Sequence, residues 1–298
     1  MTLRRIGLTG ATGMVGRHFL SLLKDRGVEA VPVSKDGRIG TSWNLRQWLE
    51  FDQLDSLFPG VDAIVHAGAI IPTSLRPVTP GEMFDVNVRS CLCLGEWALS
   101  RGVPLAFVSS GSIYPDIESI GITETTPIGN NSARSDYSLS KVMAEQIFDN
   151  LACRGLRRII FRPSSLYGSG LPGDKLIPRF LATAAAGGTL RLSSPVGTRI
   201  DFVHAADLCR SIFGALAADI SGIFNISSER PTSMIDLAEA CIAASGGGSI
   251  LVDGTEEEIR PTGRLLLDCA KARREFAYSP VVSLDLGLVA MARGDVVI

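Results

Sequence analysis

The sequence predicts an α/β protein in which a doubly wound parallel β-sheet has helices on both faces and a smaller subdomain follows. Two observations lead to this fold class. Over the first 165 or so residues, short apolar runs alternate with longer amphipathic stretches, which is the pattern of successive strand–helix units. Inside the apolar runs polar and apolar residues hardly alternate, as expected for strands buried on both faces.

The elements of the first half follow one another in strict order. The apolar runs predict strands over Arg5–Thr9, Ala30–Val33, Ala63–His66, Leu105–Ser109 and Arg158–Phe161. The stretches between them predict helices that include Met14–Arg26, Leu45–Phe58, Pro80–Arg101 and Arg134–Arg154. Because strand–helix–strand crossovers are right-handed, this order predicts a Rossmann-type sheet.

After residue 165 the pattern becomes less regular, and glycine and proline mark several loops. We expect helices over Asp174–Ala186, Ala205–Ala217, Ser233–Ala244 and Asp268–Phe276, and strands over Ile223–Ile226 and Ser249–Val252. The predicted division is therefore a Rossmann domain over residues 1–165 and a smaller subdomain over 166–298, interleaved with the last sheet strands.

Composition excludes several classes of function. The chain is 46% hydrophobic and 20% charged, as in ordinary globular proteins, and its net charge of −2 comes with no basic block that would bind nucleic acid. Six cysteines without a CxxC pair and three unclustered histidines predict neither disulfides nor a metal site. Without a long apolar segment, the sequence predicts a cytoplasmic protein that does not associate with membranes.

A glycine-rich turn follows the first predicted strand. Gly10, Gly13 and Gly16 stand in TGATGMVG with GxxGxxG spacing, directly before a helix. Such a turn lets the backbone approach a pyrophosphate, whose charge lies against the helix N-terminus. Since the turn lies in the first strand–helix–strand unit, it predicts a dinucleotide site.

The end of the second strand bears on which dinucleotide binds. An acidic residue there normally holds the adenosine ribose of NAD, but this chain has Ser34 and Lys35, with Arg38 close behind. A hydroxyl and a cation favour the 2′-phosphate of NADP, while NAD stays possible because Lys35 and Arg38 can also be solvated loop charges.

A tyrosine and a lysine four residues apart predict acid–base chemistry. Tyr137 and Lys141 share one face of a predicted helix. A nearby ammonium stabilises a phenolate and can therefore lower the pKa of Tyr137 toward a range useful for proton transfer. The preceding strand ends in a serine cluster from Ser109 to Ser112, which can hydrogen-bond a substrate oxygen.

Several motifs in one order resemble the NAD-dependent epimerase/dehydratase family, the extended branch of the short-chain dehydrogenases/reductases. The glycine turn is similar to TGxxGxxG, and Ser109–Tyr114 to SSxxVYG, although Pro115 replaces the usual glycine. The remaining matches are VHAGA from Val65, NV from Asn87, YSLSK from Tyr137, RPSSLYG from Arg162, DFVH from Asp201 and FNI from Phe224.

The resemblance implies a role for each matched residue. The catalytic set would be Ser110, Tyr137 and Lys141, with Ser112 touching the substrate. Asn44 takes the place of the aspartate that reads the adenine edge, Ala67 and Gly68 would lie under the cofactor, and Ser165 would face the nicotinamide carboxamide. The full expected cofactor set is Gly10, Thr12, Gly13, Met14, Val15, Gly16, Ser34, Lys35, Asn44, Leu45, Ala67, Gly68, Ala69, Asn87, Tyr137, Lys141, Pro163 and Ser165.

The motifs also narrow the reaction. Dehydratases of this family have an Asp-Glu pair directly after the catalytic hydroxyl, whereas this chain has Gly111 and Ser112, so dehydration is disfavoured. Two reactions at a sugar carbon, C4 by analogy, stay open: reduction of a 4-keto sugar, and 4-epimerisation by removal and return of a hydride. The acidic residue that normally holds the adenosine ribose of NAD is missing from the end of the second strand, and its absence favours the reductase.

The substrate implied is a nucleotide-activated sugar, with Arg199 and Arg260 as candidate diphosphate contacts. Arg199 stands one residue earlier than the family pattern places it, and the acid that usually follows Arg260 is missing. A non-nucleotide ketone is therefore an alternative substrate, and a catalytically idle NADP sensor an alternative function. By family analogy the protein is a homodimer joined through the helices near residues 82–101 and 134–153.

Overall fold

A large parallel sheet forms the centre of the molecule. The computed structural model describes residues 2–115, 120–128, 135–193, 198–253, 263–264 and 266–298. Seven strands lie in the order β3-β2-β1-β4-β5-β7-β11, and all neighbouring pairs are parallel. The strand order reverses between β1 and β4, so the prediction of a doubly wound Rossmann-type sheet is confirmed.

The strands of this sheet follow the apolar runs of the sequence. Their bounds are Arg5–Thr9 (β1), Glu29–Ser34 (β2), Thr41–Ser42 (β3), Ala63–His66 (β4), Leu105–Val108 (β5), Arg158–Pro163 (β7) and Gly222–Ile226 (β11). Since β11 lies beyond residue 165, the second half of the chain contributes a strand to the large sheet. Where domains divide stays a prediction.

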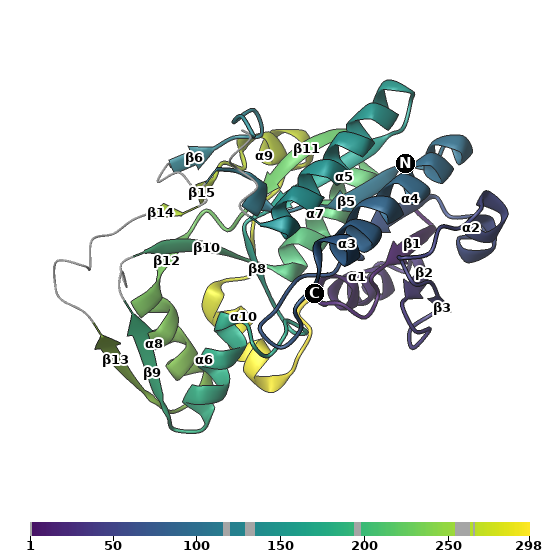
Figure 1. The fold of residues 1–298 in the computed structure, drawn as a ribbon. Coiled ribbons are helices and arrows are strands. Elements are labelled where there is room, and N and C mark those ends of the chain that lie inside the picture. The colour runs from purple at the N-terminus through teal and green to yellow at the C-terminus, as the bar shows by residue number, and fades with distance from the viewer. Residues whose placement is uncertain (1, 116–119, 129–134, 194–197, 254–262, 265) are drawn as a thin grey trace.

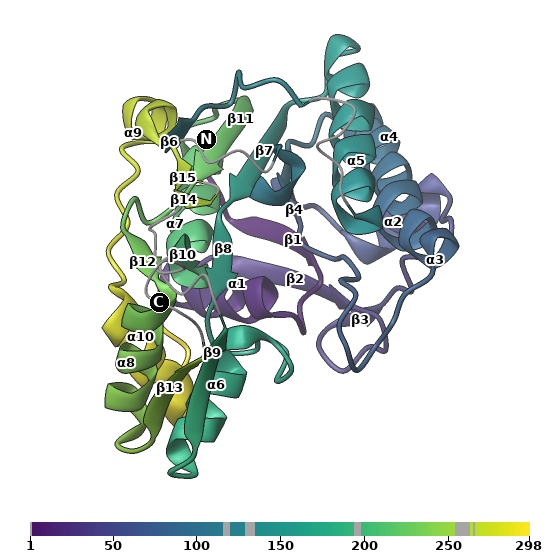
Figure 2. The ribbon, with the colours of Figure 1, turned by 60° about the vertical axis from the view of Figure 1, so that its left-hand side comes forward.

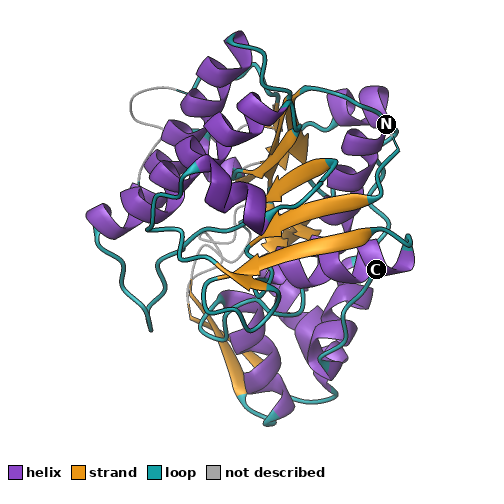
Figure 3. Ribbon diagram, turned by 90° about the vertical axis from the view of Figure 1, so that its right-hand side faces the viewer, coloured by secondary structure: helices purple, strands orange, loops and turns teal. Residues whose placement is uncertain are grey.

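Helices cover both faces of the sheet (Figures 1 and 3). On one side pack α2 (Phe51–Leu57), α3 (Pro80–Phe84), α4 (Ser90–Arg101) and α5 (Asp136–Cys153), and on the other α1 (Met14–Asp25), α7 (Ala205–Ala217) and α9 (Ala270–Phe276). Each side buries its own apolar cluster, with Trp97 and Phe148 in one and Phe19 and Ile212 in the other. Because the strands are buried on both faces, they appear in the sequence as continuous apolar runs.

A smaller lobe is built from the second half of the chain (Figure 2). Its helices are α6 (Leu176–Ala185), α8 (Met234–Ser245) and α10 (Leu284–Arg293). They share an apolar cluster that includes Phe180, Leu237 and Leu288. Its strands are β8 (Ser165–Tyr167), β9 (Thr189–Ser193), β10 (Arg199–His204), β12 (Pro231–Ser233), β13 (Ser249–Asp253) and β14 (Gly263–Arg264); β6 (Ile120–Ile122) pairs with β15 (Leu266–Leu267) beside the large sheet.

Several predicted elements differ from those observed. The helix expected from Leu45 begins only at Phe51, because residues 45–50 form an irregular segment that ends in a capping box at Glu50. Strands β8, β9, β10 and β12 and helix α10 were not predicted. Within the described ranges no helix has the length and apolar character needed to cross a membrane.

Candidate active site

The glycine turn is held tightly between two neighbouring strands. Gly10 has a φ of +74°, and a Cβ on it would lie 2.7 Å from the Gly68 nitrogen. A Cβ on Gly16 would collide with the Gly10 carbonyl oxygen, so this glycine lets α1 pack onto the turn. Gly13 has an ordinary backbone conformation, and a Cβ there would approach only the Gly10 oxygen, at 3.3 Å. The turn therefore matches the shape that the sequence predicts.

A buried hydrogen-bond chain fixes the loop after β4 against this turn. The Thr9 hydroxyl accepts from Gly68 N at 3.1 Å and lies 2.6 Å from His66 Nδ1. Burial lowers the pKa of His66 to about 3, so the imidazole is neutral. The Ser90 hydroxyl, 3.4 Å from His66 Nε2, donates its own proton to the Val86 carbonyl, and this favours the tautomer with the proton on Nε2 and Nδ1 as the acceptor from Thr9. The chain thereby sets the floor of the cleft described next.

A cleft of about 310 Å³ lies beside the turn, at the carboxyl end of the strands. Ligands of doubly wound sheets bind at such a point, where the strand order reverses. The cleft brings together ten of the predicted cofactor residues: Gly10, Thr12, Gly13, Ser34, Lys35, Asn44, Leu45, Ala67, Gly68 and Ala69. Lining residues that the sequence did not reveal as part of the site are Asp36, Trp43, Arg46, Ile70, Arg76 and Val86.

Four of the five charged side chains that line this cleft are cationic. Arg38 pairs with Asp36 at 2.6 Å and holds the pKa of that carboxyl below its usual value, while Arg46 pairs with Glu82. Lys35 and Arg76 make no ion pair with any other described residue. The sequence could have revealed Asp36, two positions after Ser34, but Arg76 reaches the cleft only through the fold.

Ser34 itself faces partly inward. Its side chain is buried, and its hydroxyl oxygen accepts from Ile39 N at 3.3 Å. It therefore shapes the turn that carries Lys35 and Arg38 into the cleft.

Asn87 contributes to the site by positioning other groups. It lies in the π-helical turn Asp85–Arg89 between α3 and α4, and such turns often mark functional sites. Its amide accepts from Ile70 N at 2.8 Å and donates to Ile70 O and to Ser140 Oγ, at 2.9 and 3.1 Å. Asn87 thus joins the cleft wall to α5, and its expected direct contact with a cofactor stays a prediction.

The three predicted catalytic residues come together at the carboxyl end of β5, the neighbour of β4. Tyr137 hydrogen-bonds to the Ser110 side chain, and Lys141 Nζ lies 5.7 Å from the centre of the Tyr137 ring. The lysine donates a 2.8 Å hydrogen bond to the Val108 carbonyl and lies over the Phe107 ring. Tyr137 and Lys141 reach this place because they stand four apart in α5.

The pKa values differ from the expectation for an activated phenol. Burial raises the pKa of Tyr137 to about 12, and its hydrogen bond to Ser110 offsets only part of that rise. Burial also lowers the pKa of Lys141 to about 8, although the negative charge of the Glu145 carboxylate acts in the opposite direction. In this structure the phenol is therefore firmly protonated at neutral pH, and the lysine stands close to titration.

A buried polar network supports the end of β5 from below. Arg162 forms an ion pair with Glu145 at 2.6 Å and donates to the Tyr114 hydroxyl at 2.8 Å. Ser109 donates to the same carboxylate, and the Tyr114 hydroxyl donates to Asn225 at 2.7 Å. A fully paired network of this kind holds its members in one arrangement, and here it fixes the backbone just before Ser110.

Gly111 lies directly against β7. A side chain at this position would come within 2.8 Å of the Pro163 carbonyl oxygen. The close approach places Pro163 beside the serine cluster. It also leaves no room for the acid that the dehydratase motif would put at position 111.

On the substrate side the structure locates one of the two candidate arginines. Arg199 is exposed at the start of β10, on the strand face that also carries Asp201. Arg260 lies outside the described residues. Asp201 is buried and accepts from Ser164 Oγ and Ser228 N, at 2.8 and 2.7 Å, so it holds the segment just before Ser165.

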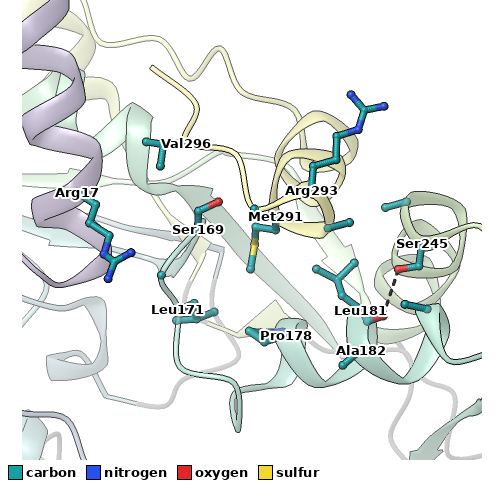
Figure 4. Close-up of a pocket in the computed structure, with 15 residues that line it drawn as sticks. Arg17, Ser169, Leu171, Pro178, Leu181, Ala182, Ser245, Met291, Arg293 and Val296 are labelled. Atoms are coloured by element: carbon teal, nitrogen blue, oxygen red, sulfur yellow. Dashed lines mark hydrogen bonds between the residues drawn. The ribbon is translucent and has the colours of Figure 1, made fainter.

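A larger cavity lies elsewhere. It measures about 660 Å³ and opens between α1, α6, α8 and the end of α10, with Arg17 and Arg293 at its edges and Leu181 and Met291 in its wall (Figure 4). No predicted site residue lines it, and its lining contains no histidine, cysteine or carboxylate side chain. No three potential metal ligands converge in the part of the chain that the structure describes.

The chain is similar in sequence to several known enzymes. It is 25% identical over 305 residues to UDP-glucuronic acid decarboxylase 6 of Arabidopsis thaliana, covering 96% of this chain and 87% of that protein. It is 27% identical over 287 residues to UDP-glucose 4-epimerase of Neisseria meningitidis serogroup A, covering 82% and 83%.

Among solved structures, the UDP-glucose 4-epimerase of Thermus thermophilus in complex with NAD matches 97% of this chain and 98% of its own, with a TM-score of 0.80 and 21% identity. That match concerns the fold alone. The model of the "NAD dependent epimerase/dehydratase family" matches residues 6–227, about three quarters of the sequence. The chain therefore belongs to the NAD-dependent epimerase/dehydratase family.

Proposed function

We propose that this protein transfers a hydride to or from C4 of a nucleotide-activated sugar, as a 4-ketoreductase or a 4-epimerase, with Tyr137 as the general acid–base. One observation carries the proposal: Ser110, Tyr137 and Lys141 converge at the sheet edge beside the glycine-turn cleft. The first relatives are enzymes named for UDP-sugars, and the Thermus structure contains NAD, which supports a nicotinamide cofactor here.

The cleft residues fit such a cofactor. The glycine turn and the N-terminus of α1, with Met14 and Val15, would hold the pyrophosphate. Asn44 and Leu45 would take the adenine, and Pro163 and Ser165 the nicotinamide end. Lys35, Arg38, Arg46 and Arg76 all line the cleft and support NADP over NAD, because a 2′-phosphate needs positive partners.

Each of the three catalytic residues has a different role in proton transfer. The bound nicotinamide supplies or accepts the hydride. In reduction, Tyr137 gives its hydroxyl proton to the carbonyl oxygen while Ser110 holds that oxygen in place. In oxidation, Tyr137 takes the proton back as phenolate, which the Lys141 ammonium stabilises.

A protonated Tyr137 supports reduction as the direction of the reaction. With its pKa raised to about 12, Tyr137 is protonated at neutral pH and ready to donate. Oxidation, with which 4-epimerisation begins, first needs the phenolate. The positive charge of an oxidised nicotinamide would lower the pKa of Tyr137, and this keeps the epimerase as the second candidate.

The substrate class rests on the relatives and on Arg199. If Arg199 binds a diphosphate, the charge-assisted contact contributes ~1.5–3 kcal/mol, so Arg199→Ala should raise KM by about ten- to a hundred-fold. The same holds for Arg260. KM values unchanged in both variants would favour a non-nucleotide ketone instead.

A homodimer is also part of the proposal. Phe84 at the end of α3 and Leu139 and Met143 on α5 are exposed by 46%, 47% and 37%. Since Leu139 and Met143 lie one turn apart on the same helix face, they offer apolar surface to a second copy. Sedimentation of the purified protein tests this.

A hydride-transfer assay tests the function itself. The protein should oxidise NADPH with a 4-keto sugar nucleotide, and its cofactor site should be empty after purification if it is a reductase. Tightly held NAD would point to the epimerase. Cofactor binding without turnover on any ketone would identify an idle sensor.

A further inference from the structure

The loop between β4 and α3 connects the cofactor cleft with the smaller lobe. Ile70 and Arg76 line the cleft, whereas Ser74 and Leu75, which stand between them, contact the segment just before α6. The Ser74 hydroxyl donates to Asp174 Oδ2 at 3.0 Å, and Leu75 N donates to the same oxygen at 3.3 Å. These partners stand 100 and 99 residues apart in the chain, so the contact joins the two halves of the protein.

A second contact of the same kind lies next to the first. Lys175 Nζ donates to the Pro72 carbonyl at 3.3 Å. Inside the loop, Thr73 and Arg76 exchange two backbone hydrogen bonds of 3.1 Å each, which close a tight turn between them. Since this turn ends at Arg76, a contact that holds the turn also holds that residue in the cleft wall.

Little else fixes this loop. Residues 71–78 are all exposed or half-buried, and Leu75 is 82% exposed. Within the described ranges, every hydrogen bond from residues 71–78 to another segment ends at Asp174 or Lys175. A loop that buries so little apolar surface depends on its polar contacts for a fixed position.

The segment that carries Asp174 is itself held beside the glycine turn. It leaves β8 and passes the N-terminus of α1, where a Cβ on Gly170 would lie 3.3 Å from Met14 Cα. Two backbone hydrogen bonds, of 3.1 and 3.0 Å, close successive turns within residues 168–175. The loop is therefore tied to a segment that packs against the helix whose N-terminus would hold the pyrophosphate.

We propose that Asp174 and Lys175 form a latch with which the smaller lobe holds Arg76 in the wall of the dinucleotide cleft. Since Arg76 has no ion-pair partner among the described residues, its guanidinium can bind a phosphate of the cofactor. Asp174 is a positioning residue in this scheme, because it acts on the cofactor through Arg76.

The latch rests on the dinucleotide site of the proposed function and adds a coupling between the two halves of the protein. Coupling between two sites is reciprocal in free energy. A dinucleotide that orders Arg76 should therefore also order the segment before α6, and so slow amide hydrogen exchange in residues 168–176. This protection should be lost in Asp174→Ala.

Hydrogen exchange and cofactor titration of Asp174→Ala test the latch together. In the protein alone, the amides of residues 73–76 should exchange about tenfold faster than in wild type, because Leu75 N loses its acceptor. The Kd of the dinucleotide, measured for both NADPH and NADH, should rise by about three- to tenfold for the form that binds more tightly. The Tm should change little, since the latch involves no core residue.

Matched variants separate the latch from a general effect on the lobe. Asp253→Ala removes an exposed aspartate whose partner, Arg191, lies on the neighbouring strand of the same lobe, and should change neither exchange in the loop nor Kd. Asp174→Asn keeps an oxygen that accepts hydrogen bonds and should recover part of the affinity. In Arg76→Ala the phosphate partner is already gone, so adding Asp174→Ala should raise Kd by less than it does in wild type.

The outcomes distinguish the latch from the proposed function. Unchanged exchange of residues 73–76 in Asp174→Ala would overturn the latch, as would an unchanged Kd or fully additive effects of Asp174→Ala and Arg76→Ala, even if the protein reduces ketones. Faster exchange together with weaker, non-additive dinucleotide binding supports the latch even if no ketone is reduced, in which case only the proposed function falls.

Discussion

At the scale of single residues, burial sets the chemistry of the catalytic pair. Tyr137 and Lys141 are both desolvated, which favours the neutral form of each and moves their pKa values in opposite directions, to about 12 and about 8. The expectation that the Lys141 ammonium can lower the pKa of Tyr137 stays a prediction, and in this structure burial has the larger effect on that pKa. Burial is a property that four-residue spacing cannot reveal.

Lys35 provides a test of cofactor choice at this scale. Its side chain lines the cleft without an ion-pair partner among the described residues, so a 2′-phosphate would give it one. We expect tighter binding of NADPH than of NADH, and Lys35→Ala should remove most of that preference. Titration of cofactor fluorescence measures both affinities.

Two results would contradict the assignment. NADH could bind as well as NADPH, or the preference could survive in Lys35→Ala. Asp36→Asn is the matched control, because it removes the one acidic side chain of the cleft and should strengthen NADPH binding rather than weaken it.

At the scale of elements, substitutions at two glycines of the turn should have different effects, one on cofactor binding alone and one on stability as well. Gly13→Ala needs only a small adjustment, since its Cβ would lie 3.3 Å from the Gly10 oxygen, but it adds a methyl group where a pyrophosphate would approach. Gly16→Ala forces α1 away from the turn. We expect Gly13→Ala to keep its Tm and lose cofactor affinity, and Gly16→Ala to lose stability as well.

Thermal unfolding and cofactor titration of the two variants decide this point. The account fails if Gly16→Ala is as stable as wild type, or if Gly13→Ala binds the cofactor normally.

The elements also show how far sequence reasoning reaches. Strands β1 and β4 were predicted to the residue, because a run buried on both faces has no polar interruptions. The prediction that a helix begins at Leu45 was wrong. Leu45 and Leu49 stand four residues apart, as they would on one face of a helix, but they pack into the core from an irregular segment. The missed strands β8, β10 and β12 are short or carry buried polar residues such as Asp201.

The site shows the same limit. The glycine turn, Tyr137 and Lys141 are local patterns, and local patterns were sufficient to predict them. Arg76 in the cleft and the bridge from Asn87 to Ser140 join segments far apart in the chain, so no spacing predicts them.

At the scale of the whole molecule, buried neutral histidines link stability to pH. The pKa of His66 is lowered to about 3, and an unfolded chain binds that proton at about 6.5. Below pH 6.5 the unfolded state therefore holds more protons, and stability falls as the pH drops toward 3. At pH 5 this group alone should cost about 2 kcal/mol of the free energy of unfolding.

Urea unfolding at pH 7 and pH 5 measures the effect. His66→Asn cannot titrate, so its loss of stability between the two pH values should be smaller than that of wild type by about 2 kcal/mol. An equal loss in both proteins would show that His66 is not held neutral by the fold.

The central claim, that Tyr137 exchanges the proton during hydride transfer, is tested most directly by kcat of Tyr137→Phe with cofactor affinity measured beside it. We predict a loss of about 10²–10⁴-fold in kcat with nearly unchanged cofactor binding, since the phenol oxygen acts only on the reacting carbonyl. Lys141→Ala should also weaken cofactor binding, and Ser110→Ala should cost less kcat. Retention of more than about a tenth of wild-type kcat in Tyr137→Phe, against that expectation, would contradict the account.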